Sequence, residues 1–152
     1  MKKLFMCLCF AVMLLTGCDS GSDGVAVLVH DEDPYVIHYY SKPEGGGKTK
    51  VYFDGYMKFP DSTTEKDIER ANQSQYDREG FVGETFELIE YDKENNIYLA
   101  RLTMYPLEMK SFDPEKFFEE QRENYSYLGK PVMNPSKSEV KKMINELVKI
   151  SE

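Results

Sequence analysis

Residues 35–59 read YVIHYYSKPEGGGKTKVYFDGYMKF, and this stretch determines the sheet of the fold. Residues 35–41 are rich in β-branched and aromatic side chains, which favour a strand. Residues 42–47 contain one proline and three glycines, so they predict a turn. The chain then alternates again, with Val51 and Phe53 on one face of a second predicted strand.

The dipeptide Asp54-Gly55 interrupts this second alternating segment. An Asp-Gly pair between alternating residues is the strongest short-range hairpin signal, because both central residues of a type I′ turn need positive φ. The sequence therefore predicts a tight turn at Asp54-Gly55. A return strand is expected over residues 56–59, and it ends at Pro60.

Three further strands are predicted on either side of this stretch. Residues 25–29 form a short β-branched run, and residues 84–91 and 97–105 are two longer strand candidates joined by a polar turn. The last candidate has four apolar side chains at a spacing of two, and we predict that this face belongs to the core. These four residues are Tyr98, Ala100, Leu102 and Met104.

Three helices are predicted from their capping residues. Ser62 and Glu65 have the spacing of a capping box, and Asp113 followed by proline is typical of a cap and the first helical position. Ser136 or Ser138 caps the last helix, which is the clearest amphipathic helix of the chain. The apolar positions of this helix are Val140, Met143, Ile144, Leu147 and Val148.

This order of elements predicts an α+β domain, with an antiparallel sheet of about five to six strands packed by two to three helices and covered on one side. Residues 25–152 are ample for a single domain with one core. Residues 54–60, together with the Phe-rich helix that follows Asp113, resemble the PsbP-like fold. Some periplasmic lipoproteins have that fold. The chain departs from it because the strands expected before its final helix are missing.

The first eighteen residues indicate where the protein resides. Two lysines precede an apolar run over residues 4–15, which is the layout of a signal peptide. The run closes with Leu-Thr-Gly and then Cys18, and this ending resembles the lipobox of bacterial lipoproteins. The resemblance implies that residues 1–17 are cleaved and that the Cys18 thiol carries lipid, with fatty acyl chains such as palmitate.

Two other interpretations of the leader remain. Twelve helical residues span about 18 Å, well short of the roughly 30 Å hydrocarbon core, which disfavours a retained transmembrane helix. An ordinary cleaved leader needs small residues at the cut, and Thr16-Gly17 can supply them. A cysteine at the place that lipidation requires favours the lipoprotein.

Asp19 follows the anchor cysteine. In enterobacterial lipoproteins an aspartate at that position is associated with escape from sorting to the outer membrane. The resemblance therefore implies retention at the inner membrane, with the domain in the periplasm. Residues 18–24 are then the lipidated N-terminus and a flexible linker, in which Asp19 can also be a simple solvated residue.

Charge and cysteine content exclude several classes of function. Removal of the leader leaves 17 basic and 27 acidic side chains, and such an acidic surface repels nucleic acid. Cys7 and Cys9 leave with the leader, and lipid occupies the Cys18 thiol. The mature domain then has no thiol for a disulfide, a zinc site or thiolate catalysis.

The sequence offers little enzymatic chemistry, so we predict a protein that is not an enzyme and needs no cofactor. Residues 45–49 resemble the end of a phosphate-binding loop, but Lys42 stands where that loop needs a glycine. The motif G-x-S-x-G of serine hydrolases does not occur. The acidic run between His30 and His38 is the only gathering of imidazole and carboxylate, and it is the candidate for a metal site.

The tyrosines suggest a binding surface. Tyrosine suits protein interfaces, because its ring and hydroxyl both fit a partly wet contact. We expect an exposed tyrosine-rich patch near Tyr52 and Tyr56. The leading hypothesis is a membrane-anchored periplasmic lipoprotein whose domain binds another envelope protein, as an assembly accessory or as an immunity or inhibitor protein. The alternative is a lipoprotein that binds a small molecule or a metal, with His30 and His38 near the mouth of the pocket.

Overall fold

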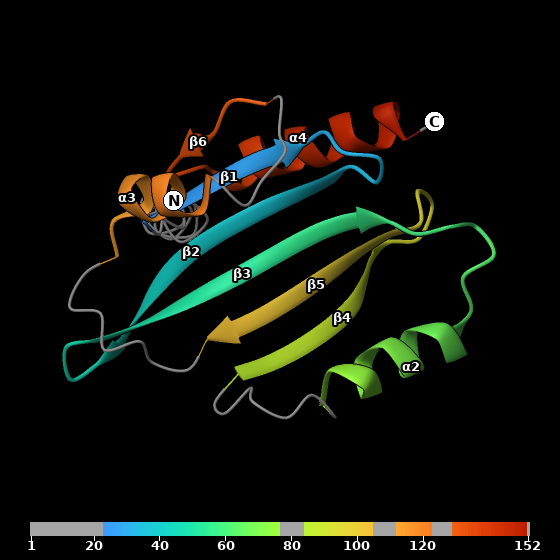
Figure 1. Ribbon diagram of the computed structural model, residues 1–152, viewed down its shortest axis with the longest axis horizontal. Helices are drawn as coiled ribbons and strands as arrows, with labels where there is room; N and C mark the ends of the chain where they lie inside the picture. The colour runs from blue at the N-terminus through green and yellow to red at the C-terminus, as the bar shows by residue number, and fades with distance from the viewer. Residues whose placement is uncertain (1–22, 77–83, 105–111, 123–128, 152) are drawn as a thin grey trace, which may run out of the picture.

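The computed structural model describes residues 23–76, 84–104, 112–122 and 129–151. In this part of the chain a six-stranded antiparallel sheet carries three helices, in the strand order β4-β5-β3-β2-β1-β6 (Figure 1). The predicted α+β class is therefore confirmed. The predicted signal peptide, the Cys18 anchor and Asp19 lie outside the described residues.

Figure 1 shows α3 and α4 at the β1 side of the sheet and α2 beside β4 at its other side. The strands are β1 (Gly24–Val29), β2 (Tyr35–Gly45), β3 (Lys48–Lys58), β4 (Glu84–Asp92), β5 (Ile97–Met104) and β6 (Val132–Met133). The helices are α2 (Glu65–Tyr76), α3 (Pro114–Gln121) and α4 (Lys137–Ile150).

The predicted turn at Asp54-Gly55 is wrong, because β3 continues through both residues. The turn predicted within residues 42–47 is confirmed at the glycine run 45–47, whose three residues have positive φ and join β2 to β3. Asp54 and Gly55 pair with β2 on one side and with β5 on the other, so they lie in a central strand. Pairing to two neighbours overrides the local turn preference of the dipeptide.

Both faces of the sheet near β1 are covered, not one as predicted. On one face Val140, Ile144 and Leu147 of α4 pack in a core cluster with side chains of β1, β2, β3 and β5. On the other face Phe118 of α3 and the nearby Phe112 pack on alternate residues of β1, β2 and β3. Strand β1 is buried along its whole length, because its alternate side chains pack in the α4 cluster on one face and in the α3 cluster on the other.

The predicted core face of β5 needs a related correction. Ile97 and Leu99, which point to the α4 side, are buried in the core. On the predicted face Ala100 is buried, whereas Tyr98 and Leu102 are only half-buried. The reason is that α4 covers the side opposite to the one that the alternation suggested.

The predicted caps of α3 and α4 are confirmed, whereas the cap of α2 lies two residues later than predicted. Asp113 accepts hydrogen bonds from two backbone N–H groups at the start of α3, and Ser136 forms a capping box with Glu139 at the start of α4. The box of α2 joins Thr64 to Asp67 instead of Ser62 to Glu65.

Asn72 of α2 covers the outer edge of β4. Its Oδ1 accepts a hydrogen bond from the Leu88 N–H at 2.8 Å, and its Nδ2 donates to the Leu88 carbonyl oxygen at 3.4 Å. The side-chain amide thus occupies the place of a peptide group from a neighbouring strand. At the opposite edge of the sheet, β6 has only two residues.

Candidate functional site

A polar row crosses the middle of the sheet on its α4 side. The strand register sets His38 of β2 opposite Asp54 of β3, and Asp54 opposite Arg101 of β5. The Arg101 guanidinium donates two hydrogen bonds of 2.8 Å to the two carboxylate oxygens of Asp54. Asp54 is only 3% exposed, so this bidentate ion pair is what makes its burial tolerable.

Two tyrosines and a lysine extend this row. Tyr40 donates a hydrogen bond from its hydroxyl to Asp54 at 3.3 Å, and its ring stacks on His38 and on Tyr52. Burial, together with the Asp54 charge, raises the pKa of Tyr40 to about 12. The Lys42 ammonium lies 4.9 Å from the centroid of the Tyr52 ring.

The predicted tyrosine patch is not exposed as expected. Tyr56 is only 7% exposed and belongs to the α4 core, where Tyr91 meets its ring edge-on. Burial and the Asp54 charge raise the pKa of the Tyr56 hydroxyl well above its usual range. Tyr52 is half-buried, and its ring stacks on the ring of Tyr40. Tyr56 is therefore a core residue on the α4 side, whereas Tyr52 lies on the same face of β3 and is only partly buried.

The two histidines lie apart. His30 follows the end of β1, whereas His38 pairs with Ala26 in that strand. Four residues at roughly 3.3 Å each separate these positions by about 13 Å along the sheet. No group of three His, Cys, Asp or Glu side chains in the described part of the chain is placed to hold a metal ion.

His38 is nevertheless unusual. Its Nε2 is buried and has no hydrogen-bond partner among the described residues. Burial lowers the pKa of its imidazole, and the nearby Asp54 carboxylate offsets this effect only in part. The native protein therefore favours the neutral imidazole.

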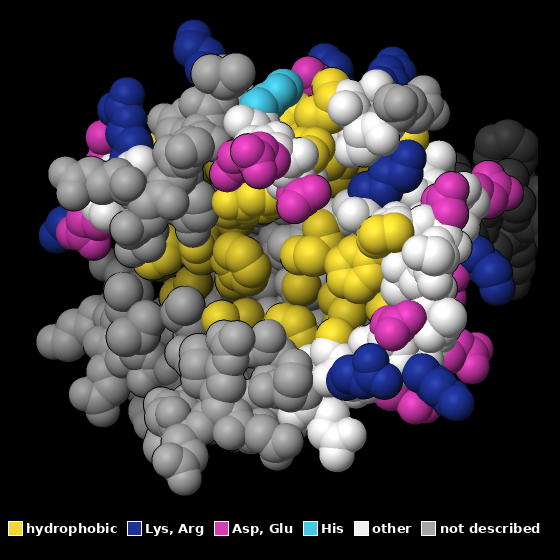
Figure 2. All heavy atoms as spheres, turned by 45° about the vertical axis from the view of Figure 1, so that its right-hand side comes forward, with side chains coloured by type: hydrophobic (Ala, Val, Ile, Leu, Met, Phe, Trp, Pro, Cys, Tyr) yellow, Lys and Arg dark blue, Asp and Glu magenta, His cyan; other side chains and the backbone are white. Residues whose placement is uncertain are grey.

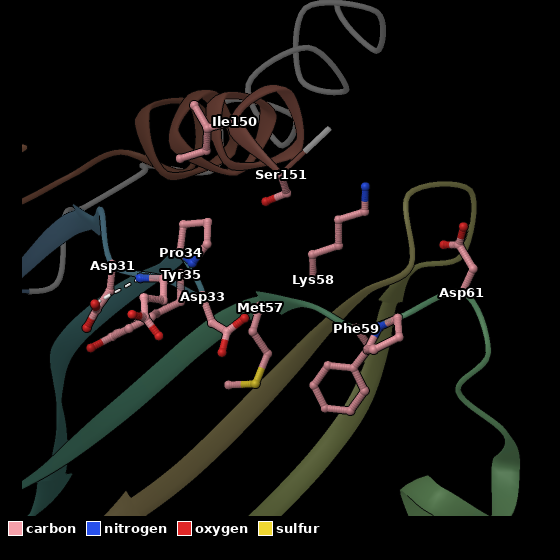
Figure 3. A pocket seen from close by; sticks show the side chains of 12 residues that line it. Asp31, Asp33, Pro34, Tyr35, Met57, Lys58, Phe59, Asp61, Ile150 and Ser151 are labelled. Carbon is pink, nitrogen blue, oxygen red and sulfur yellow. Dashed lines mark hydrogen bonds between the residues drawn. The ribbon is translucent and has the colours of Figure 1, made fainter.

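A groove opens at the end of the sheet where β2 begins and β3 ends. It has a volume of about 1020 Å³ and lies between the C-terminal end of α4 and the loops after β1 and β3 (Figure 3). Figure 2, turned toward this end, shows hydrophobic side chains around a hollow and acidic side chains beside it. The lining residues are Asp31, Glu32, Asp33, Pro34, Tyr35, Met57, Lys58, Phe59, Pro60, Asp61, Ile150 and Ser151.

The groove combines apolar surface with negative charge. Its lining has four carboxylates and only one ammonium group, that of Lys58. None of the ion pairs formed among the described residues involves these carboxylates. In Figure 3, Asp31 and Asp33 lie on one side and Asp61 on the other, while Ile150 projects from the helix above. The groove therefore presents four exposed carboxylates beside its apolar lining.

Sequence reasoning found the acidic run 31–33 but missed the groove. Its apolar members come from the start of β2, the end of β3 and the C-terminal end of α4, and α4 lies far from the two strands in the chain. One signal was available, because Ile150 extends the apolar face of α4 beyond the last core residue. The contact of that helix end with the other two segments depends on the fold.

Comparison with known proteins gives no match to a family model, a curated protein or a solved structure. Among the described residues, no helix has the length and apolar character needed to cross a membrane. The function must therefore be inferred from the geometry of the chain itself.

Loss of either partner of the Asp54–Arg101 pair should reduce stability, by different amounts. Arg101→Met leaves a buried carboxylate without its cation, whereas Asp54→Asn leaves a guanidinium on a side chain that is 35% exposed and can reach water. We expect Arg101→Met to lower the free energy of unfolding by about 3–5 kcal/mol, and Asp54→Asn by less. Urea unfolding followed by circular dichroism measures both.

The control for this comparison is Arg70→Met, which removes an exposed ion pair with Asp67. Its effect should stay below about 1 kcal/mol. A loss for Arg101→Met no larger than that of the control would show that the buried pair is not needed for stability.

The low pKa of His38 should make stability depend on pH. As the pH falls through about 6.5, the unfolded chain binds a proton at this residue more readily than the native protein does, so stability should fall as the pH falls from 7.5 toward 5.5. His38→Phe, which keeps a ring at this position, should flatten the curve. Urea unfolding of the wild type and of His38→Phe at several pH values tests this. An unchanged slope in His38→Phe would contradict the prediction.

Proposed function

We propose that this chain is a lipoprotein of the bacterial cell envelope, anchored through lipid on Cys18, and that its domain binds another envelope protein without catalysing a reaction. Its role would be that of an assembly accessory or of an immunity or inhibitor protein. The observation that carries the proposal is the short stretch of chain between the anchor cysteine and the first residue that the structure describes.

That first residue is Asp23. Its carbonyl oxygen accepts hydrogen bonds from the N–H of Ser41 at 2.9 Å and from the Ser41 hydroxyl at 3.3 Å. The next residue, Gly24, exchanges hydrogen bonds with Asn134, one to the side-chain oxygen and one from the backbone N–H. Five residue steps from Cys18 to Asp23 span at most about 18 Å. A lipid on Cys18 would therefore hold the start of β1 close to the membrane surface.

The groove lies at the opposite end of β1. The six residues of this strand, at about 3.3 Å each, place the loop that carries Asp31 and Asp33 roughly 20 Å from the tethered end. The groove would then face away from the membrane, where an envelope protein can reach it. An acidic surface of this kind can also imitate an anionic substrate in a basic cleft, which favours the inhibitor role.

The anchor is tested by Cys18→Ser. Serine has a similar size but lacks the thiol that lipid transfer requires, so the variant should take up no labelled fatty acid and should keep its leader. The wild type should incorporate the label and have residue 18 as its mature N-terminus, as measured by mass spectrometry. Asp19→Ser is the companion variant, and in an enterobacterial host it should move the lipoprotein from the inner to the outer membrane fraction. A wild type without label would contradict the anchor.

The partner is tested by cross-linking in intact membranes, followed by purification of the full lipoprotein. We expect at least one envelope protein to be enriched over an unrelated domain that carries the same leader and lipid. This control removes proteins that are captured only because they share the membrane. Equal recovery with both baits would contradict a protein-binding function.

A further inference from the structure

We propose that the groove binds a cationic segment of the partner protein, in which lysine or arginine side chains flank an apolar side chain. This inference rests on the proposed function, because it assigns the chemistry of the partner at the end of the domain that faces away from the membrane. The apolar surface, the arrangement of charge and the end of helix α4 each support it.

The apolar part of the groove comes from side chains that are held in place. Tyr35 and Met57 are paired across β2 and β3, and both are half-buried. Phe59 stacks on Tyr98 with 4.7 Å between the ring centroids. Ile150 is 42% exposed at the end of α4, although the same helix buries Ile144 and Leu147 completely or nearly so. Met57 and Phe59 point away from the α4 side of the sheet, and Ile150 lies on the α4 side (Figure 3), so the groove offers apolar surface on both sides of the sheet end.

The charges lie on two sides of this apolar surface. Asp31, Glu32 and Asp33 belong to the loop after β1, and Asp61 belongs to the segment after β3. All four side chains are exposed and lack a cation among the described residues. A segment with positive charges on either side of an apolar residue would match both flanks at once.

The end of α4 adds to the negative potential. The C-terminal end of a helix carries partial negative charge, and Ile150 and Ser151 of this end line the groove. In Figure 3 the Lys58 side chain extends up toward this helix end from the strand below. The Lys58 ammonium group of the chain itself thus points toward the C-terminal end of α4. We propose that the cations of the partner lie near the same helix end.

The test uses the full lipoprotein in nonionic detergent and a dye-labelled peptide in which lysines flank leucine and phenylalanine. Fluorescence anisotropy should show saturable binding that weakens as salt is added. The same peptide with glutamate in place of lysine should not bind. Ile150→Ser should weaken binding of the lysine peptide severalfold, because it removes the exposed apolar contact.

The decisive comparison uses two triple variants of equal charge. Asp31→Asn, Asp33→Asn and Asp61→Asn together remove three groove carboxylates, and should weaken binding by about tenfold. The control variant removes three exposed carboxylates of α2 and α3, and should bind as the wild type does. It combines Glu69→Gln, Glu115→Gln and Glu120→Gln.

Equal weakening in the two triple variants, or equal binding of the lysine and glutamate peptides, would overturn the groove assignment. So would a cross-linked partner that is recovered equally well by the groove variant and the wild type, and the proposed function would survive that result. Peptide binding that depends on the groove, in a protein that takes up no fatty acid, would instead support the groove and contradict the anchor.

Discussion

The ion pair between Asp54 and Arg101 is the constraint on which the sheet depends. A carboxylate in the middle of a central strand is tolerable only if a cation meets it there, and Arg101 does so with both of its hydrogen bonds. A shift of β5 by one residue would turn Arg101 to the other face and leave Asp54 without its cation. The pair therefore favours the observed register of β3 and β5.

The same constraint explains which parts of the fold the sequence could predict. The cap at Asp113, the amphipathic face of α4 and the hairpin between β4 and β5 depend on neighbouring residues, and the structure confirms them. The turn at Asp54-Gly55 was predicted wrongly because the partner of Asp54 lies 47 residues later in the chain. Short-range signals carry no information about such a partner.

The candidate site was less predictable than the fold. The acidic run 31–33 is visible in the sequence, but its role depends on Phe59, Ile150 and other side chains that only the folded chain brings to it. Tyr56 and His38 are predicted as binding residues from their chemical type alone, and both lie on the face that α4 helps to bury. Residue type alone does not tell which face of a strand a helix will cover.

The amide of Asn72 has a consequence for molecules that are crowded on a surface. An edge strand with free N–H and C=O groups can recruit an edge from a second molecule, and confinement to two dimensions makes such encounters frequent. The Asn72 side-chain amide is hydrogen-bonded to both the N–H and the carbonyl oxygen of Leu88, so another strand cannot pair with β4 at this residue. A second sheet that paired with β4 at Leu88 would have to displace this amide, so one side chain of α2 opposes edge-to-edge association at that position.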